Sequence, residues 1–132
     1  MKRFGLSANE RIKSRKDFEV IFSEGKTIFS SDKKIKATYF VEENIEVSGI
    51  KIAAAVNKKA GKAVWRNRIK RLVRAIYRQN KEEILEKCHK KKYLLKIVFS
   101  PYMLNKKKNK QVLLDDLKPG ILEILLKLKR SL

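Results

Sequence analysis

Alternation of apolar and polar residues predicts a strand at residues 50–57. Successive side chains of a strand point to opposite faces of a sheet, so a period of two places one set in the core and leaves the other set open. The core set is Ile50, Ile52, Ala54 and Val56, and the opposite set is Lys51, Ala53, Ala55 and Asn57. The opposite set is small or polar, which lets another molecule approach the backbone.

A helical period dominates residues 62–79 and predicts the best-defined helix of the chain. At about 100° per residue, its large apolar side chains fall within one third of the circle. They are Trp65, Ile69, Leu72, Val73 and Ile76. The opposite side carries Asn67, Arg68, Lys70, Arg71, Arg74 and Arg78, with Arg66 at the border.

A first helix is expected from Ser14 to Gly25. Ser14 and Asp17 have the spacing of a capping box, and Gly25 is expected to close the helix in the left-handed conformation. Phe18, Ile21 and Phe22 would share one face.

Weaker patterns predict the remaining elements. Residues 35–41 and 93–99 are rich in strand-forming residues, and a short extra strand is expected near 27–29. The charged segment 80–92 predicts one further helical turn. A last helix should begin near Asp115 or Asp116, with Pro119 in its first turn. Its inward side chains would be Ile121, Leu122, Leu125, Leu126 and Leu128.

The order of these elements predicts a single α/β domain over residues 1–132. We expect residues 1–13 to form a basic arm that is extended or loosely ordered. No repeat or linker divides the chain.

The charge of the chain favours a polyanionic partner. Its 132 residues include 34 Lys and Arg but 14 Asp and Glu, which gives a formal net charge of +20. A net charge of about 2–8 already keeps a small domain soluble, so solubility alone does not account for this excess. Nucleic acid is the commonest polyanion that relieves such self-repulsion.

The arginine side of the predicted helix has no internal counter-charge nearby in the sequence. No acidic residue occurs between Glu46 and Glu82, whereas ordinary solvated helix faces mix signs. Because guanidinium groups bind phosphate in a bidentate manner, this side predicts an RNA-binding surface.

Other residues indicate where the protein works and what it lacks. The lone cysteine, Cys88, allows no intramolecular disulfide and favours the cytoplasm. No signal peptide or membrane span is expected. Cys88-His89 has no second pair with which to bind a metal, and the acidic pairs do not suggest a metal-dependent nuclease.

Residues 58–74 resemble the signature of the ribonuclease P protein family. The fixed positions of that signature are Lys58, Lys59, Gly61, Ala63, Val64, Arg66, Asn67, Arg68, Lys70, Arg71 and Arg74. The segment 15–18 with Phe22 and Gly25 also resembles the family's first helix, and 93–101 resembles its last strand.

The resemblance implies an α/β (α+β) two-layer sandwich that is ribosomal protein S5 domain 2-like. Its order is αβββαβα, with a left-handed βαβ crossover. It also implies a subunit of ribonuclease P, which removes the 5′ leader of precursor tRNA. A catalytic RNA uses Mg²⁺ for the chemistry, while the protein supplies no catalytic side chain and binds no cofactor.

The resemblance also implies two binding sites. Ribonuclease P RNA would bind Lys58, Lys59, Arg66, Asn67, Arg68, Lys70, Arg71 and Arg74. The leader would bind Phe18, Phe22, Tyr39, Phe40, Lys51, Ala53, Ala55 and Asn57. An insertion around 31–34 leaves the choice between Tyr39 and Phe40 open, and Phe18 and Phe22 could instead be core residues. Neither a membrane nor an obligate protein partner is expected.

Three other functions are weighed against this one. A structural protein that binds ribosomal RNA would share the charge but not the full signature. An architectural DNA-binding protein would bind duplex DNA. A protein-only endonuclease would cleave precursor tRNA without an added RNA.

Overall fold

The chain folds around a four-stranded sheet with the strand order β1-β2-β4-β3. A computed structural model describes residues 10–43, 46–105, 107 and 109–132. The strands are β1 (Lys26–Phe29), β2 (Ile35–Glu42), β3 (Gly49–Ala54) and β4 (Leu94–Pro101). Neighbouring strands are antiparallel except β3 and β4, which are parallel. The short strand expected near 27–29 is confirmed as β1.

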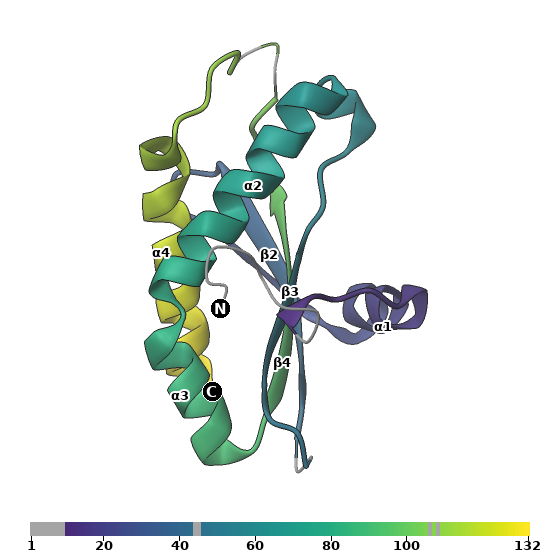
Figure 1. Ribbon diagram of the computed structural model, residues 1–132, viewed down its shortest axis with the longest axis vertical. Coiled ribbons are helices and arrows are strands. Elements are labelled where there is room, and N and C mark those ends of the chain that lie inside the picture. Colours follow the sequence, from purple (N-terminus) through teal and green to yellow (C-terminus); the bar gives the residue numbers. More distant parts are fainter. Residues whose placement is uncertain (1–9, 44–45, 106, 108) are drawn as a thin grey trace, which may run out of the picture.

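Helices lie on both sides of the sheet (Figure 1). One side carries α2 (Ala63–Asn80), α3 (Glu82–Lys91) and α4 (Leu114–Ser131), and the other carries α1 (Arg15–Glu24). Because α2 and α3 connect the parallel strands β3 and β4, the chain makes the βαβ crossover that the resemblance implies. The mixed α/β architecture is confirmed.

The main core lies between the sheet and the three helices on its first side. The alternation predicted for β3 is confirmed there, since Ile50 and Ile52 are buried while Lys51 and Ala53 are only partly covered. The same period of two sends Ile97 and Phe99 of β4 into this core.

A smaller core lies under α1, on the opposite side of the sheet. Ile12, Ile21 and Val98 are buried there, and Phe18 and Phe40 pack against them. Ile12 belongs to the segment expected to be an arm; its backbone N–H donates to the carbonyl of Ile52 at 3.0 Å. Residues 1–9 of that expected arm lie outside the described residues.

The ends of α1 confirm one prediction and correct another. The Ser14 hydroxyl accepts a hydrogen bond from the backbone N–H of Lys16 at 3.1 Å, as expected of a capping residue. Gly25 is not left-handed, because its φ is −82° and its ψ is 177°. A Cβ at Gly25 would lie 2.4 Å from the carbonyl oxygens of both Ile21 and Tyr39. The glycine is therefore required by the close approach of α1 to β2.

The charged segment at 80–92 forms a whole helix, α3, rather than one turn. Ile84 and Cys88, four residues apart, are its buried side chains. Together with the partly buried Leu85, these few apolar positions were too short a pattern to predict a helix among so many charges.

The last helix begins earlier than expected, at Leu114, so Pro119 lies in its second turn. The carboxylate of Asp116 accepts a hydrogen bond from the N–H of Leu113 at 2.8 Å and closes the N-terminus. The predicted inward face was also partly wrong. Leu126 is 45% exposed, whereas Leu117 and Ile124 are buried.

No helix among the described residues is long and apolar enough to cross a membrane.

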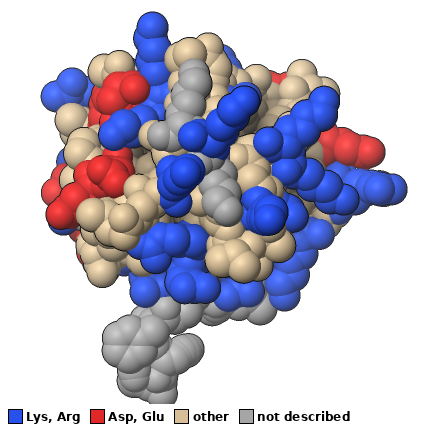
Figure 2. Space-filling model, turned by 90° about the horizontal axis from the view of Figure 1, so that it is seen from above, with Lys and Arg blue, Asp and Glu red and all other residues tan. Residues whose placement is uncertain are grey.

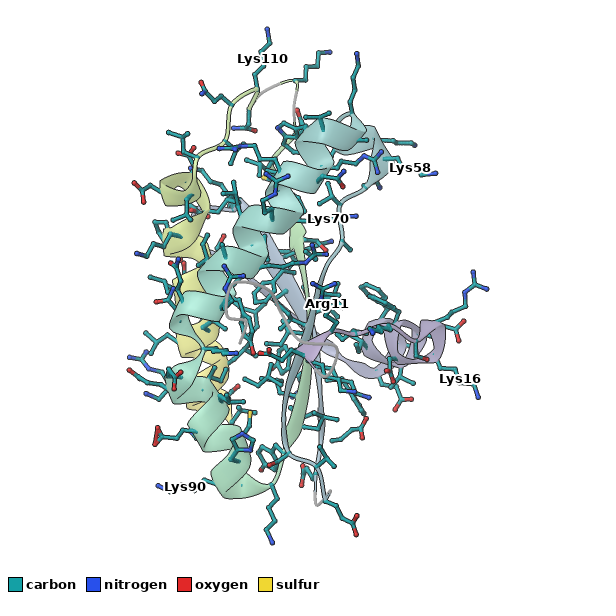
Figure 3. The ribbon with its side chains drawn as sticks, viewed as in Figure 1. Arg11, Lys16, Lys58, Lys70, Lys90 and Lys110 are labelled. Carbon is teal, nitrogen blue, oxygen red and sulfur yellow. The ribbon has the colours of Figure 1, made fainter. Side chains whose placement is uncertain are left out.

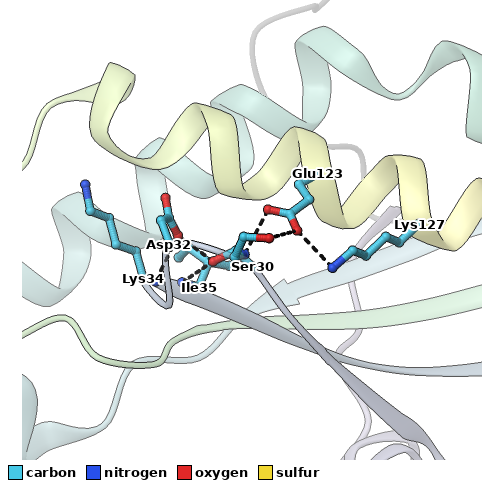
Figure 4. Close-up of polar contacts among 7 residues, drawn as sticks. Ser30, Asp32, Lys34, Ile35, Glu123 and Lys127 are labelled. Atoms are coloured by element: carbon cyan, nitrogen blue, oxygen red, sulfur yellow. Dashed lines mark hydrogen bonds and ion pairs between the residues drawn. The ribbon is translucent and has the colours of Figure 1, made fainter.

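A polar network fastens the β1–β2 turn to α4 (Figure 4). The carboxylate of Glu123 accepts hydrogen bonds from the backbone N–H of Ser31 at 2.9 Å and from its hydroxyl at 2.6 Å. Lys127 forms an ion pair with the same carboxylate at 2.9 Å. The hydrogen bonds from Lys127 and Ser31 lower the pKa of Glu123 to about 2.

Glu123→Gln should remove a pH-dependent contribution to stability. A carboxyl with a lowered pKa stabilises the fold above its unfolded pKa of about 4.5, and this contribution is lost as the pH falls toward 2. Since Glu123 lies at the surface, we expect a loss of about 1 kcal/mol near neutral pH. Urea unfolding of the protein and the variant between pH 7 and pH 2 measures this difference. Glu86→Gln is the control, and a difference that stays constant with pH would contradict the prediction.

Candidate nucleic-acid interface

The amphipathic character predicted for α2 is confirmed. Trp65, Ile69, Val73 and Ile76 are buried against the sheet and α4. On the other side of the helix, Asn67 and Arg71 are exposed, and the remaining basic residues are partly exposed. The helix therefore separates its apolar and cationic side chains.

The cationic side of α2 keeps its charge. Within residues 10–43, 46–105, 107 and 109–132, no ion pair joins an arginine of α2 to a carboxylate. Arg74 is half-buried, and burial together with the nearby charge of Arg11 lowers its pKa. Such crowding of like charges favours an external anion.

Two of the α2 arginines also hold backbone segments. The Nε of Arg66 donates to the carbonyl of Gly61 at 3.0 Å, and the Nε of Arg68 donates to the carbonyl of Val112 at 2.8 Å. Trp65 adds a hydrogen bond from its indole Nε1 to the carbonyl of Asn109 at 2.9 Å. The start of α2 thus anchors both the loop before it and the segment that precedes α4.

The loop before α2 is ordered by Asn57. The side-chain oxygen of Asn57 accepts a hydrogen bond from the N–H of Lys59 at 2.8 Å and caps a 3-10 turn, Lys58–Ala60. This cap leaves the side chains of Lys58 and Lys59 exposed. In Figure 3, Lys58 and Lys110 project from the same end of the molecule.

A hollow of about 1300 Å³ lies at this end, and we call it the basic hollow. It is bounded by the loop before α2, the start of α2, the end of β4 and the segment after β4. Its basic lining residues are Lys36, Lys58, Lys59, Lys62, Arg66, Lys107 and Lys110. In the part of the chain that the structure describes, no Asp or Glu lines it. Figure 2 shows Lys and Arg across most of this end, with Asp and Glu toward its margins.

An aromatic pair lies on α1, next to the open side of the sheet. The ring centroids of Phe18 and Phe22 are 6.4 Å apart, with an interplanar angle of 17°. Phe18 is half-buried on the smaller core, whereas Phe22 is 57% exposed. Ala53 and Ala55 pack beside this core, and Ala55 also lines the basic hollow. The smaller core under α1 and the basic hollow therefore share Ala55.

On the same side of the sheet, the lysine of β4 is neutralised within the protein. Lys96 is buried, and its ammonium forms ion pairs with Asp17 of α1 and Glu42 of β2. Burial alone would lower the pKa of Lys96, but the hydrogen bonds that its ammonium donates to the two carboxylates outweigh burial and raise that pKa. Lys96 therefore differs from the lysines that line the basic hollow, for which no ion pair is described.

The ribonuclease P family model matches residues 6–121. The chain belongs to the ribonuclease P protein family. It is 39% identical to the ribonuclease P protein component of Syntrophus aciditrophicus over 62% of this chain and 65% of that protein. It is 32% identical to that of Porphyromonas gingivalis over 73% of this chain and 69% of that protein. The match thus spans just under two thirds of the Syntrophus protein.

Solved structures of ribonuclease P proteins share the fold. The protein from Thermotoga maritima aligns with a TM-score of 0.69 at 28% identity, covering 89% of this chain and 96% of that chain. The protein from Staphylococcus aureus aligns with a TM-score of 0.66 at 25% identity, covering 90% of this chain and 94% of that chain.

The structure decides between the two aromatic candidates on β2. Phe40 shares the α1 side of the sheet with Phe18, whereas Tyr39 packs against the main core on the opposite side. Tyr39 therefore does not share the α1 side with the other residues that were predicted to bind the leader, because adjacent strand residues point to opposite faces. Lys51 remains on the α1 side, where it pairs with Lys96, whereas Asn57 lies beyond the end of β3 and its side-chain oxygen is engaged by Lys59.

Several residues of this surface were missed from the sequence. Lys36 could have been found, because it alternates with the apolar Ile35 and Ala37 of β2. Lys107 and Lys110 could not, because contacts with distant residues, among them the hydrogen bonds from Trp65 and Arg68, hold their segment beside the hollow. Among the residues that the structure describes, no group of three or more His, Cys, Asp or Glu could hold a metal ion.

Arg68→Ala and Arg71→Ala should differ in their effect on stability. Arg68 loses the hydrogen bond to the Val112 carbonyl, so we expect a loss of about 1–2 kcal/mol. Arg71 is exposed, and its replacement should change stability by less than about 0.5 kcal/mol. Urea unfolding of both variants measures the contrast. If both variants lower the free energy of unfolding equally, the hydrogen bond from Arg68 to Val112 does not contribute to stability.

Proposed function

We propose that this chain is the protein subunit of ribonuclease P. The subunit binds the catalytic RNA and the 5′ leader of precursor tRNA, and so assists endonucleolytic removal of the leader. The observation that carries this proposal is the uncompensated arginine side of α2, which adjoins a basic hollow without a carboxylate in its described lining. Arginine suits structured RNA because its guanidinium binds phosphate oxygens in pairs.

We assign the catalytic RNA to the α2 side of this surface. Asn67 and Arg71 are exposed there, and Lys70 and Arg74 lie beside them. Arg66 and Arg68 each use one N–H to hold the protein backbone, which leaves their other guanidinium N–H groups for phosphate. Lys58 and Lys59 extend the same charge along the loop.

We assign the leader to the surface between α1 and the open side of the sheet. A single strand is bound by stacking its bases on aromatic rings and pairing its phosphates with cations. Phe22 offers an exposed ring, Ala53 and Ala55 keep the floor low, and Lys51 lies on the same side. Phe40 of the sheet and Phe18 of α1 pack against the same small core.

The protein supplies no catalytic side chain in this proposal. Activation of water is the task of Mg²⁺ held by the catalytic RNA. The carboxylates with described ion pairs are spread over the fold and engaged by lysines, as in Lys81–Glu10 and Lys129–Glu83. The protein would therefore contribute binding and orientation of the RNA strands.

We also propose that the protein works in the cytoplasm, without an obligate protein partner. Cys88 is a free, buried thiol, and burial raises its pKa to about 11. Such a thiol is unreactive and is compatible with a reducing compartment.

The central experiment measures cleavage of precursor tRNA by the protein, by its ribonuclease P RNA and by the two together. We expect no cleavage by the protein alone. At low Mg²⁺ the protein should tighten the binding of precursor tRNA to the RNA and leave mature tRNA nearly unchanged. Cleavage by the protein alone would indicate a protein-only nuclease. Co-purification with ribosomal subunits would instead indicate a ribosomal protein.

Phe22→Ala tests the leader surface directly. Stacking on an aromatic ring contributes about 1–3 kcal/mol per base, so the variant should lose about tenfold in affinity for precursor tRNA. Its affinity for mature tRNA and for the catalytic RNA should stay unchanged. The control is Leu126→Ala, which removes another exposed apolar side chain, on α4. An equal loss with precursor and mature tRNA would contradict leader binding by α1.

Arg71→Ala tests the assignment of the catalytic RNA. Loss of one phosphate contact should weaken binding and reduce the slope of log affinity against log salt by about 1. Titration of the catalytic RNA at several salt concentrations measures both quantities. Lys90→Ala on α3, at the opposite end of the molecule, is the control (Figure 3). If both variants keep the wild-type slope, α2 is not the contact surface.

A further inference from the structure

A second pair of aromatic rings lies on the open side of the sheet, away from α1. Phe29 at the end of β1 and Tyr102 just after β4 are 43% and 47% exposed. Their ring centroids are 4.6 Å apart and their planes are tilted by 58°. We call these two residues the edge pair. Together they expose a π surface that the described part of the fold leaves open.

The edge pair borders the basic hollow. Lys36 pairs with Phe29 on β1 and with Ser100 on β4, so these three residues form a row across the sheet. Lys36, Ser100 and Tyr102 all line the hollow. The Lys36 ammonium lies 6.0 Å from the centroid of the Tyr102 ring. A phosphate contact and a stacking surface are therefore adjacent.

The backbone holds the edge pair in place. The N–H of Tyr102 donates to the carbonyl of Lys34, and the N–H of Met103 donates to the carbonyl of Lys33, both at 2.9 Å. The β1–β2 turn is closed by the Ser30 hydroxyl, which donates to Asp32 at 2.6 Å (Figure 4). Glu123 ties the same turn to α4. A fixed platform loses little conformational freedom when a base stacks on it.

The charge around the edge pair selects its occupant. An apolar peptide has no anionic group to pair with the lysines of the hollow. A single-stranded nucleic acid has phosphates for the lysines and bases for the aromatic rings. The hollow also reaches Ala55, which packs against the smaller core under α1, the same core that Phe18 covers. The edge pair and the aromatic pair of α1 therefore lie on the same side of the sheet, and Ala55 connects the hollow to the core under α1.

We propose that the edge pair is a second base-stacking site for the single-stranded leader of precursor tRNA. In this arrangement one leader base stacks near Phe22, the phosphates cross the basic hollow, and a further base stacks on Tyr102 and Phe29. This inference rests on the proposed binding of the leader. It adds a contact site that the signature and the first helix do not include.

The test is an abasic scan of the leader. Precursor tRNAs that lack one leader base at a time are bound to the reconstituted complex of protein and catalytic RNA. With the wild-type protein, we expect the affinity for precursor tRNA to fall about tenfold when the missing base lies in either of two separate groups of leader positions. In the Tyr102→Leu variant, removal of a base should no longer lower the affinity at one of these groups of positions. In the Phe22→Ala variant, the same should hold at the other group only. Tyr102→Phe keeps the ring and should behave as wild type, while Met103→Ala controls for a neighbouring exposed side chain.

The outcomes separate the two proposals. If Phe22→Ala removes one group of losses while Tyr102→Leu leaves every loss in place, the edge-pair site is overturned and leader binding stands. If Tyr102→Leu weakens binding of the protein to the catalytic RNA but leaves binding of the leader unchanged, the edge-pair site is likewise overturned. If no abasic position weakens binding to the wild-type complex, leader binding by this surface is overturned along with the edge-pair site.

Discussion

The packing of α2 against the sheet is the interaction on which the rest of this surface depends. Burial of Trp65, Ile69, Val73 and Ile76 fixes the rotation of the helix. The arginines must then point outward, where no described ion pair neutralises them. The hydrophobic gain on one side of the helix offsets the charge repulsion on the other, and an RNA ligand relieves that repulsion.

The same helix also shapes the site around it. Trp65 and Arg68 hold the segment before α4, and Arg66 holds the loop that carries Lys58. Side chains within the signature segment 58–74 therefore also hold neighbouring loops in place through hydrogen bonds. The basic hollow exists because both loops are fastened to the first turns of α2.

On the α1 side of the sheet, the positive charge is neutralised at Lys96 but not at the basic hollow. Lys96 is neutralised by Asp17 and Glu42, while the described lining of the basic hollow contains no carboxylate. A phosphate near this side would therefore be attracted toward the hollow rather than toward Lys96.

The sequence by itself determined the elements with a strong period and the chemistry of α2. The alternation in β3, the two sides of α2 and the signature at 58–74 were all local patterns, and local patterns are set by residue spacing. Where the pattern was short or charged, the prediction was incomplete: α3 is longer than the single turn expected, and Pro119 lies in the second turn of α4 rather than in the first. Tertiary structure alone decided why residue 25 is glycine, which of Tyr39 and Phe40 faces α1, and that Lys107 joins Lys58 around one hollow. These features depend on contacts between segments far apart in the chain, which the order of residues within a segment does not encode.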